Sequence, residues 1–218
     1  MNRRPRLLAT AAAGATAALL LTACGGGDDE SKGNDKIAGA DTGGSASASP
    51  SASASPVEGR PKIELPSDVD ITFTPEQSGD ATRDAILKDN AEYIRALNAA
   101  IVAQNPRLPA LEFYTEGEGA AASQDWVQAF KTAGWTVTGT VRYFDRQVDV
   151  KSKGRASLSY CGDESKGFSK VIKTGEIKKT KATKNSYIAY GVQVEKNEQG
   201  VWELVKIVST RGAERCQR

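Results

Sequence analysis

Hydrophobic positions between residues 80 and 134 repeat with the period of an α-helix. Asp80 suits an N-cap, and the apolar stripe after it predicts one long helix that ends at Asn105-Pro106. This stripe consists of Ile86, Leu87, Tyr93, Ile94, Leu97 and Ile101. A shorter helix is predicted over Ser123–Ala133, with Gly134 as its C-terminal stop.

After Gly134 the pattern changes to the alternation of β-strands. Val137–Val150 is rich in Val, Thr and aromatic residues, and Gly139 within it is expected to form a bulge. A turn at 153–154 leads into the alternating apolar positions Ala156, Leu158 and Tyr160. Two more strands are predicted over Tyr187–Glu195 and Val201–Ser209. Helices followed by hairpin-linked strands predict the α+β class, with a mostly antiparallel sheet.

The N-terminus has the pattern of a secretory signal. Three arginines precede the uncharged run Leu7–Leu21, which is too short for the roughly 20 residues of a membrane-spanning helix. The run ends Leu21-Thr22-Ala23-Cys24 and resembles a bacterial lipobox. The resemblance implies a signal peptide over residues 1–23 and a diacylglyceryl (palmitate-type) lipid on Cys24, which would hold the protein at the extracytoplasmic face of the cell membrane. An uncleaved anchor, or ordinary cleavage that spares Cys24, are the alternatives.

Residues 24–66 are low in complexity and predict a disordered tether. The run SASASPSASASP at 45–56 has no apolar residue larger than alanine, so it cannot bury enough surface to offset its ordering entropy. As a flexible coil the tether has a reach on the order of 35 Å. Residues 67–218 remain as one folded domain of about 150 residues, a usual domain size.

Cysteine usage and charge limit the chemistry further. With Cys24 lipidated, Cys161 and Cys216 remain, and in an oxidising compartment they are expected to form a disulfide rather than two free thiols. The whole chain carries a net charge of +2, and removing the three signal arginines leaves −1. A nearly neutral, exported protein gives no case for nucleic acid as a partner.

Several motifs together resemble a known group. A lipobox, a Ser/Gly tether and two helices precede a strand that ends Tyr160-Cys161-Gly162-Asp163, and the last hairpin reads GVWELV at 200–205. This pattern is similar to actinobacterial secreted lipoproteins with an NTF2-like, cystatin-related domain. The resemblance implies a cone, in which N-terminal helices pack on a curved four-stranded sheet with a pocket at the open end. The Lys-rich stretch Lys166–Lys184 departs from that pattern.

The composition excludes most catalytic classes. The chain has no histidine, so Ser-His-Asp and Cys-His systems and the usual zinc sites are absent, and we expect no metal and no cofactor. Residues 117–122 mimic a dinucleotide fingerprint, but Glu116 and Glu118 would repel a pyrophosphate, and an exposed loop is expected instead. Cone-type acid/base chemistry would pair an aspartate with a tyrosine. The candidate pocket residues are Tyr93, Tyr143, Asp145, Asp149 and Tyr160; alternatively these aspartates are solvated and the tyrosines lie in the core.

The Lys-rich stretch is the strongest local charge feature. Lys166–Lys184 holds seven lysines and one glutamate, which would suit contact with anionic lipid or anionic wall polymer, or simply an exposed hairpin. The sequence as a whole favours a non-catalytic, membrane-anchored binding or interaction module with an unknown protein or small-molecule partner. A carrier of lipid or small apolar ligands, and an isomerase- or dehydratase-type enzyme, are the alternatives.

Overall fold

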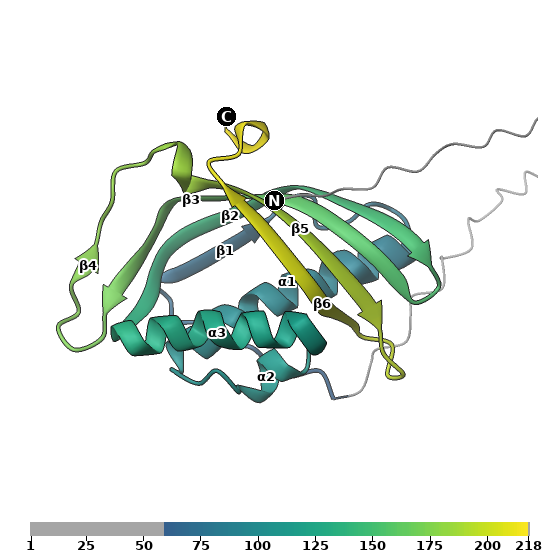
Figure 1. The fold of residues 1–218 in the computed structure, drawn as a ribbon, viewed down its shortest axis with the longest axis horizontal. Helices are drawn as coiled ribbons and strands as arrows, with labels where there is room; N and C mark the ends of the chain where they lie inside the picture. Colours follow the sequence, from purple (N-terminus) through teal and green to yellow (C-terminus); the bar gives the residue numbers. More distant parts are fainter. Residues whose placement is uncertain (1–58, 218) are drawn as a thin grey trace, which may run out of the picture. The chain divides into compact units, whose positions relative to one another are not determined.

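The computed structural model describes residues 59–217 of the chain (Figure 1). The predicted signal peptide 1–23, Cys24 and the predicted tether up to residue 58 lie outside the described residues. In chain order the strands are β1 (Val69–Phe73), β2 (Trp135–Ser152), β3 (Arg155–Val171), β4 (Ile177–Lys178), β5 (Tyr187–Lys196) and β6 (Trp202–Arg211). The helices are α1 (Ala81–Val102), α2 (Pro109–Glu112) and α3 (Gly117–Ala133), with short 3₁₀ turns η1 (Lys184–Ser186) and η2 (Glu214–Cys216).

The strands form one curved sheet in the order β1-β2-β3-β5-β6, with β4 paired to β3 (Figure 1). Every pair is antiparallel except β1 with β2, which is parallel. The predicted α+β class is confirmed, but the predicted count of four strands is wrong, since the sheet has six. The missed strands are short: β1 has five residues and β4 only two, and both lie at edges of the pairing.

The helices begin and end for local reasons. The Asp80 side chain accepts a hydrogen bond from the Arg83 amide at 2.8 Å, so the predicted N-cap of α1 is confirmed. Gly134 caps the end of α3 with φ of 68°, as its sequence position indicated. The start of α3 differs from the prediction, because residues 117–122 form its first turns rather than a loop. Gly119 has to be glycine there, since a Cβ would lie 2.3 Å from the Leu204 carbonyl oxygen.

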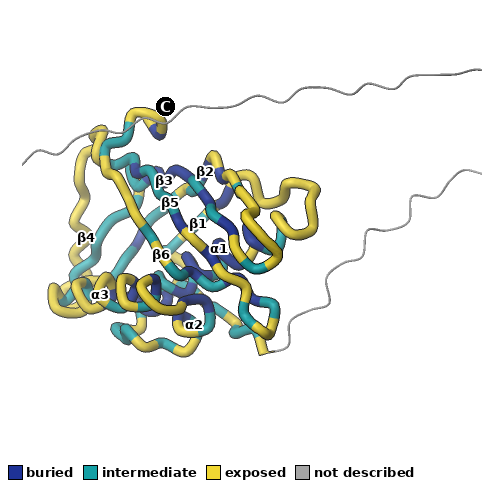
Figure 2. Tube along the Cα trace, turned by 45° about the vertical axis from the view of Figure 1, so that its right-hand side comes forward, coloured by how far each residue is buried: buried dark blue, intermediate teal, exposed yellow. Residues whose placement is uncertain are grey.

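The core fills the space between α1 and one part of the sheet. Buried positions concentrate in α1 and the middle of β3 and β5, whereas α3 and the chain around β4 are mostly exposed (Figure 2). Trp202, Leu204, Leu158, Ile86 and Leu87 are each at most 2% exposed. Burial on this scale contributes roughly 1.5–3 kcal/mol for each large apolar side chain.

Two contacts attach the ends of the described chain to this core. Residues 59–66, which the sequence assigned to the tether, pack on the domain: Ile63 lies against the core, and Arg60 forms an ion pair with the fully buried Asp89. At the other end, the predicted disulfide joins Cys161 of β3 to Cys216 of η2, with a Cα–Cα distance of 5.4 Å. The folded region therefore starts before Ser67.

Candidate functional site

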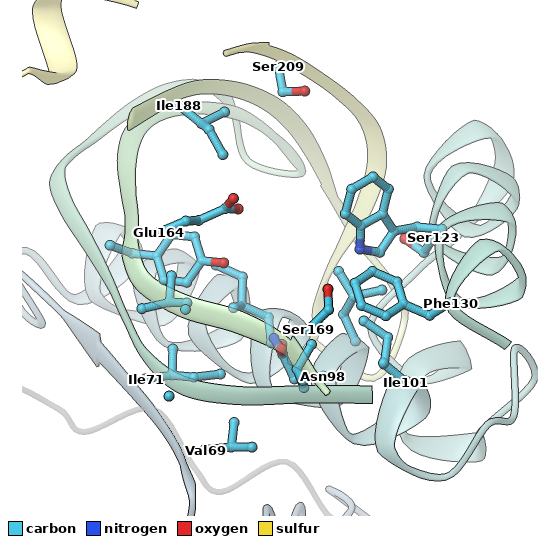
Figure 3. A pocket seen from close by; sticks show the side chains of 18 of the residues that line it. Val69, Ile71, Asn98, Ile101, Ser123, Phe130, Glu164, Ser169, Ile188 and Ser209 are labelled. Atoms are coloured by element: carbon cyan, nitrogen blue, oxygen red, sulfur yellow. The ribbon is translucent and has the colours of Figure 1, made fainter. Parts of the chain in front are cut away.

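A cavity of about 680 Å³ lies between α1, α3 and the inner face of the sheet (Figure 3). Most of its lining is apolar, and it draws on β1 and α1 as well as on the far strands β5 and β6. Among the side chains labelled in Figure 3, Val69, Ile71, Ile101, Phe130 and Ile188 provide apolar surface. This volume is within the range of about 300–1,000 Å³ that is usual for small-molecule sites.

Alternation along the strands explains which side chains reach the cavity. In β1 the apolar residues Val69, Ile71 and Phe73 pair in register with Gly139, Val141 and Tyr143 of β2. Residues two apart lie on the same face of a strand, so these positions all face the helices. The pattern Val-Asp-Ile-Thr-Phe was present in the sequence, although five residues are a weak signal.

The helix α3 forms the wall at the mouth of the cavity. Trp126 lines the cavity yet is 49% exposed, and Trp135, the first residue of β2, also lines it at 36% exposure. Phe130 lies 5.7 Å from the Trp126 ring. Trp126 and Trp135 therefore form an aromatic part of the mouth, where Asp70, Ser209 and Arg211 are exposed lining residues as well.

Tyrosines cluster at the inner end of the cavity. Tyr160 stacks on Tyr190 at 5.0 Å between ring centroids, and Tyr143 contacts both of these rings. The hydroxyl of Tyr93 is hydrogen-bonded to the Ser123 hydroxyl at 3.1 Å. Burial raises the pKa of Tyr93 to about 12 and raises the pKa values of Tyr143, Tyr160 and Tyr190 above their usual value. All four hydroxyls therefore stay protonated near neutral pH.

Glu164 is the functional candidate that the sequence analysis missed. Its carboxylate is directed into the cavity (Figure 3), and its Oε1 accepts a long hydrogen bond of 3.4 Å from the Tyr190 hydroxyl. Its Oε2 accepts a 2.9 Å hydrogen bond from Arg211 Nη1, which forms an ion pair. The alternation of Ala156, Leu158 and Tyr160 continues to position 164, so the strand pattern contained the signal.

Of the five predicted pocket residues, the structure brings only the tyrosines together. Tyr93, Tyr143 and Tyr160 line the cavity, whereas Asp145 and Asp149 are exposed and do not. The placement of these aspartates is a correction with a clear cause. A register shift between Phe144 and Gln147, with Asp145 at φ of 52°, reverses the alternation of β2. The buried Arg146 then takes the inward position, and the Asp149 carboxylate pairs with Lys151 at the surface.

The Lys-rich stretch divides into two parts. Residues 166–171 complete β3, and Lys170 there pairs with Asp68 at 3.0 Å. Residues 172–186 form a connection that contains β4 and η1 and leads into β5.

The predicted bulge at Gly139 is close to a real one, since the register between β2 and β3 shifts between Thr140 and Arg142.

The cavity offers a few polar groups in an apolar setting. Within residues 59–217 no group of three or more His, Cys, Asp or Glu side chains is arranged to hold a metal ion. No helix in the same range has the length and apolar character needed to cross a membrane. The polar lining residues supply hydroxyls of tyrosine, serine and threonine, the amide of Asn98, the carboxylates of Glu164 and Asp70, and the guanidinium of Arg211.

Comparison with known proteins gives likenesses of fold. No family model matches the chain, and no curated protein does. A solved ketosteroid isomerase-like protein from Erwinia carotovora atroseptica is 15% identical with a TM-score of 0.40, covering 58% of this chain and 93% of that one. The intermembrane space region of the chloroplast protein ARC6 is 10% identical with a TM-score of 0.37, covering 62% and 99%. A candidate scytalone dehydratase from Novosphingobium aromaticivorans is 11% identical with a TM-score of 0.36, covering 60% and 89%.

Proposed function

We propose that this domain binds one amphipathic small molecule in its cavity, and that the chain is a lipid-anchored, non-catalytic binding protein of the cell envelope. The observation that carries the proposal is the open, mostly apolar cavity of about 680 Å³. A domain that acted only through its outer surface would be expected to fill this space with side chains, because interiors normally pack to high density.

The distribution of polar groups suggests how such a ligand would lie. The apolar body would contact Leu97, Ile101 and Phe130 along the helices, with Val137 and Ile207 opposite on the sheet. A polar group would meet the Tyr190 hydroxyl and the Glu164–Arg211 pair. Few polar groups at defined places fix the orientation of a ligand, whereas apolar area supplies most of the affinity.

An acid/base enzyme is the second candidate, and the contact of 3.4 Å between Glu164 and Tyr190 favours it over one based on Asp145 or Asp149. Its requirement is a carboxylate within hydrogen-bond reach of the reacting atom. The ion pair with Arg211 occupies one oxygen of Glu164 and leaves the other toward Tyr190. Turnover of a bound ligand that is lost in Glu164→Gln, with binding retained, would replace the binding proposal by this one.

Titration of the full chain with cis-parinaric acid, a fatty acid that fluoresces in apolar surroundings, tests the binding proposal. We expect saturable binding with one site per chain. Ile207→Trp should fill part of the cavity and weaken binding by about tenfold or more, a loss of at least about 1.4 kcal/mol.

Val208→Trp is the matched control. Val208 is the next residue of β6, is 61% exposed and does not line the cavity. It lies on the opposite face of the strand, so the same added ring should leave binding unchanged. Equal affinity in the two variants, or no saturable binding at all, would refute the proposal.

A further inference from the structure

Exposed apolar side chains and lysines meet at the mouth of the cavity. Residues 172–186, named here the lysine segment, start next to the end of α3, where the Ile172 amide donates a 3.0 Å hydrogen bond to the Gly134 carbonyl. The Lys178 ammonium lies 5.5 Å from the centre of the Trp135 ring. In Figure 1 the chain around β4 lies beside the end of α3, so the lysine segment adjoins Trp135, which with Trp126 lines the cavity at its mouth.

The lysine segment has an excess of positive charge with no ion-pair partner. Its five lysines are Lys173, Lys178, Lys179, Lys181 and Lys184, and its one acidic residue is Glu176. All are exposed, and within residues 59–217 none of the five lysines takes part in a salt bridge. Of the other basic residues near the mouth, Lys170 and Arg211 have carboxylate partners, and within residues 59–217 the exposed Lys131 and Lys166 have none, so the lysine segment holds most of the unpaired charge.

Apolar side chains of the same region are left in water. Trp126 and Ile172 are each 49% exposed, Ile177 is 40% exposed and Trp135 is 36% exposed. Exposed apolar groups beside basic ones are the combination found where proteins bind membrane interfaces, since tryptophan prefers the headgroup level and lysine is attracted to anionic lipid.

We propose that Trp126, Trp135 and the lysine segment form a docking surface for an anionic lipid bilayer, so that the cavity takes up its ligand directly from the membrane. The uptake step rests on the proposed binding function. The combination of features favours a bilayer over a soluble anionic polymer, because a polymer would contact the lysines and leave the tryptophans and isoleucines in water.

The attachment of the domain permits this orientation. The described chain starts at Gly59, and Arg60 pairs with the buried Asp89, which accepts a hydrogen bond from Trp202 at the start of β6 and not from the lysine segment. The residues between Cys24 and Gly59 would span on the order of 100 Å when fully extended. This length is enough for the mouth of the cavity to reach the membrane into which a lipid on Cys24 would insert.

Vesicle co-sedimentation tests the docking surface. The full chain with Cys24→Ser carries no lipid on that cysteine, and all variants share the same N-terminal residues, so their contribution is common to every comparison between variants. Vesicles would be phosphatidylcholine alone, or phosphatidylcholine with about one third phosphatidylglycerol. We expect at least tenfold stronger binding to the anionic vesicles, and a decrease as salt is raised.

Two triple variants change the net charge equally and separate local from global attraction. Lys173→Gln, Lys179→Gln and Lys181→Gln together should lower the partition coefficient on anionic vesicles by about tenfold or more, since each lysine near such a surface is worth about fivefold before screening. Lys62→Gln, Lys88→Gln and Lys153→Gln, all exposed and outside the lysine segment, should lower it less than threefold. Equal losses in the two triples would overturn the proposal.

The tryptophans distinguish a bilayer from a polymer. Trp126→Ala with Trp135→Ala should weaken vesicle binding at least fivefold and leave retention on immobilised poly(glycerol phosphate) unchanged. Vesicle binding that is unaffected by the double variant would assign the lysine segment to a polymer and overturn the membrane proposal.

Cis-parinaric acid binding without vesicles separates this inference from the proposed function. The lysine triple variant should bind cis-parinaric acid in solution like the parent chain, but take it up from anionic vesicles more slowly. Normal binding in solution together with equal uptake rates would remove the docking surface and leave the ligand site intact. Absence of binding in solution would remove the ligand site, while vesicle sedimentation would still decide the docking surface.

Discussion

The two ends of strand β6 lie in very different environments. At its start, Trp202 and Leu204 are 2% and 1% exposed and pack against α1. Beyond a register shift at Gln193/Val194, the inward side chains are Ile207, Ser209 and Arg211, which line an open cavity. One strand thus runs from a packed end of the domain to an open end.

This difference separates stability from function within one sheet. The packed end buries large side chains on every side, which accounts for the cohesion of the domain. The open end leaves Trp126 and Trp135 in contact with solvent, where they add little to folding. Apolar surface that contributes little to folding is best explained by a binding partner that covers it. In our proposals this partner is a ligand inside the cavity and a membrane surface outside it.

Two arginine–carboxylate ion pairs, one at the packed end and one at the open end, differ in the same way. At the packed end, Asp89 is fully buried and also accepts a 2.9 Å hydrogen bond from the Trp202 amide. At the open end, the Glu164–Arg211 pair has side chains 27% and 50% exposed. The first pair should hold the fold together, and the second should be available to a ligand.

Truncating a tryptophan at each end should give the largest difference. Trp202→Ala should lower the free energy of unfolding by about 4 kcal/mol, because it removes a buried ring and leaves a cavity. Trp126→Ala should lower it by less than about 1 kcal/mol. Urea denaturation followed by circular dichroism measures both, and similar losses would mean that the open end is also part of the stabilising core.

Removing one carboxylate from each ion pair should give the next largest difference. Asp89→Ala should cost about 3 kcal/mol or more, since Arg60 loses its partner and the buried Trp202 amide is left unpaired. Glu164→Ala should cost less than about 1 kcal/mol, as is usual for a partly exposed pair. The same denaturation assay applies, and a Glu164 variant as unstable as the Asp89 variant would contradict the assignment of this pair to ligand binding.

The buried tyrosines predict a smaller effect that depends on pH. Because the pKa of Tyr93 is raised to about 12 in the folded state, the folded protein holds this proton more tightly than the unfolded chain. The contribution of Tyr93 to the free energy of unfolding is therefore fully present below pH 10. It is lost as pH rises from 10 toward 12, by about 2 kcal/mol. Tyr93→Phe should make the stability loss between pH 10 and 12 shallower by that amount, measured by urea denaturation at each pH. An unchanged slope would mean that Tyr93 is accessible to hydroxide.

The packed end could largely be predicted from the sequence, because its signals are local. The N-cap at Asp80 and the alternation of Ala156, Leu158 and Tyr160 each depend on near neighbours in the chain. Two features outside the packed end could also be predicted: the glycine stop at Gly134, which is local, and the disulfide beside the end of β6, which followed from the number of cysteines once Cys24 was set aside.

The open end was harder to predict because long-range pairing decides it. The register shift near Asp145 turns Asp145 and Asp149 away from the cavity, and nothing in the local sequence marks that shift. The strand β3 continues into the Lys-rich stretch because β2 pairs with it as far as Val171. Glu164 was accessible to prediction only by extending the alternation beyond Cys161, where polar residues obscure it.

Native mass spectrometry of the full chain, isolated from its own membrane without denaturation, tests the central claim most directly. The account predicts a discrete added mass of one small molecule per chain beyond any covalent lipid, present in Val208→Trp and absent or much reduced in Ile207→Trp. A chain that carries no non-covalent ligand, or an adduct equally abundant in both variants, would contradict the claim that the open end of the domain is a ligand site.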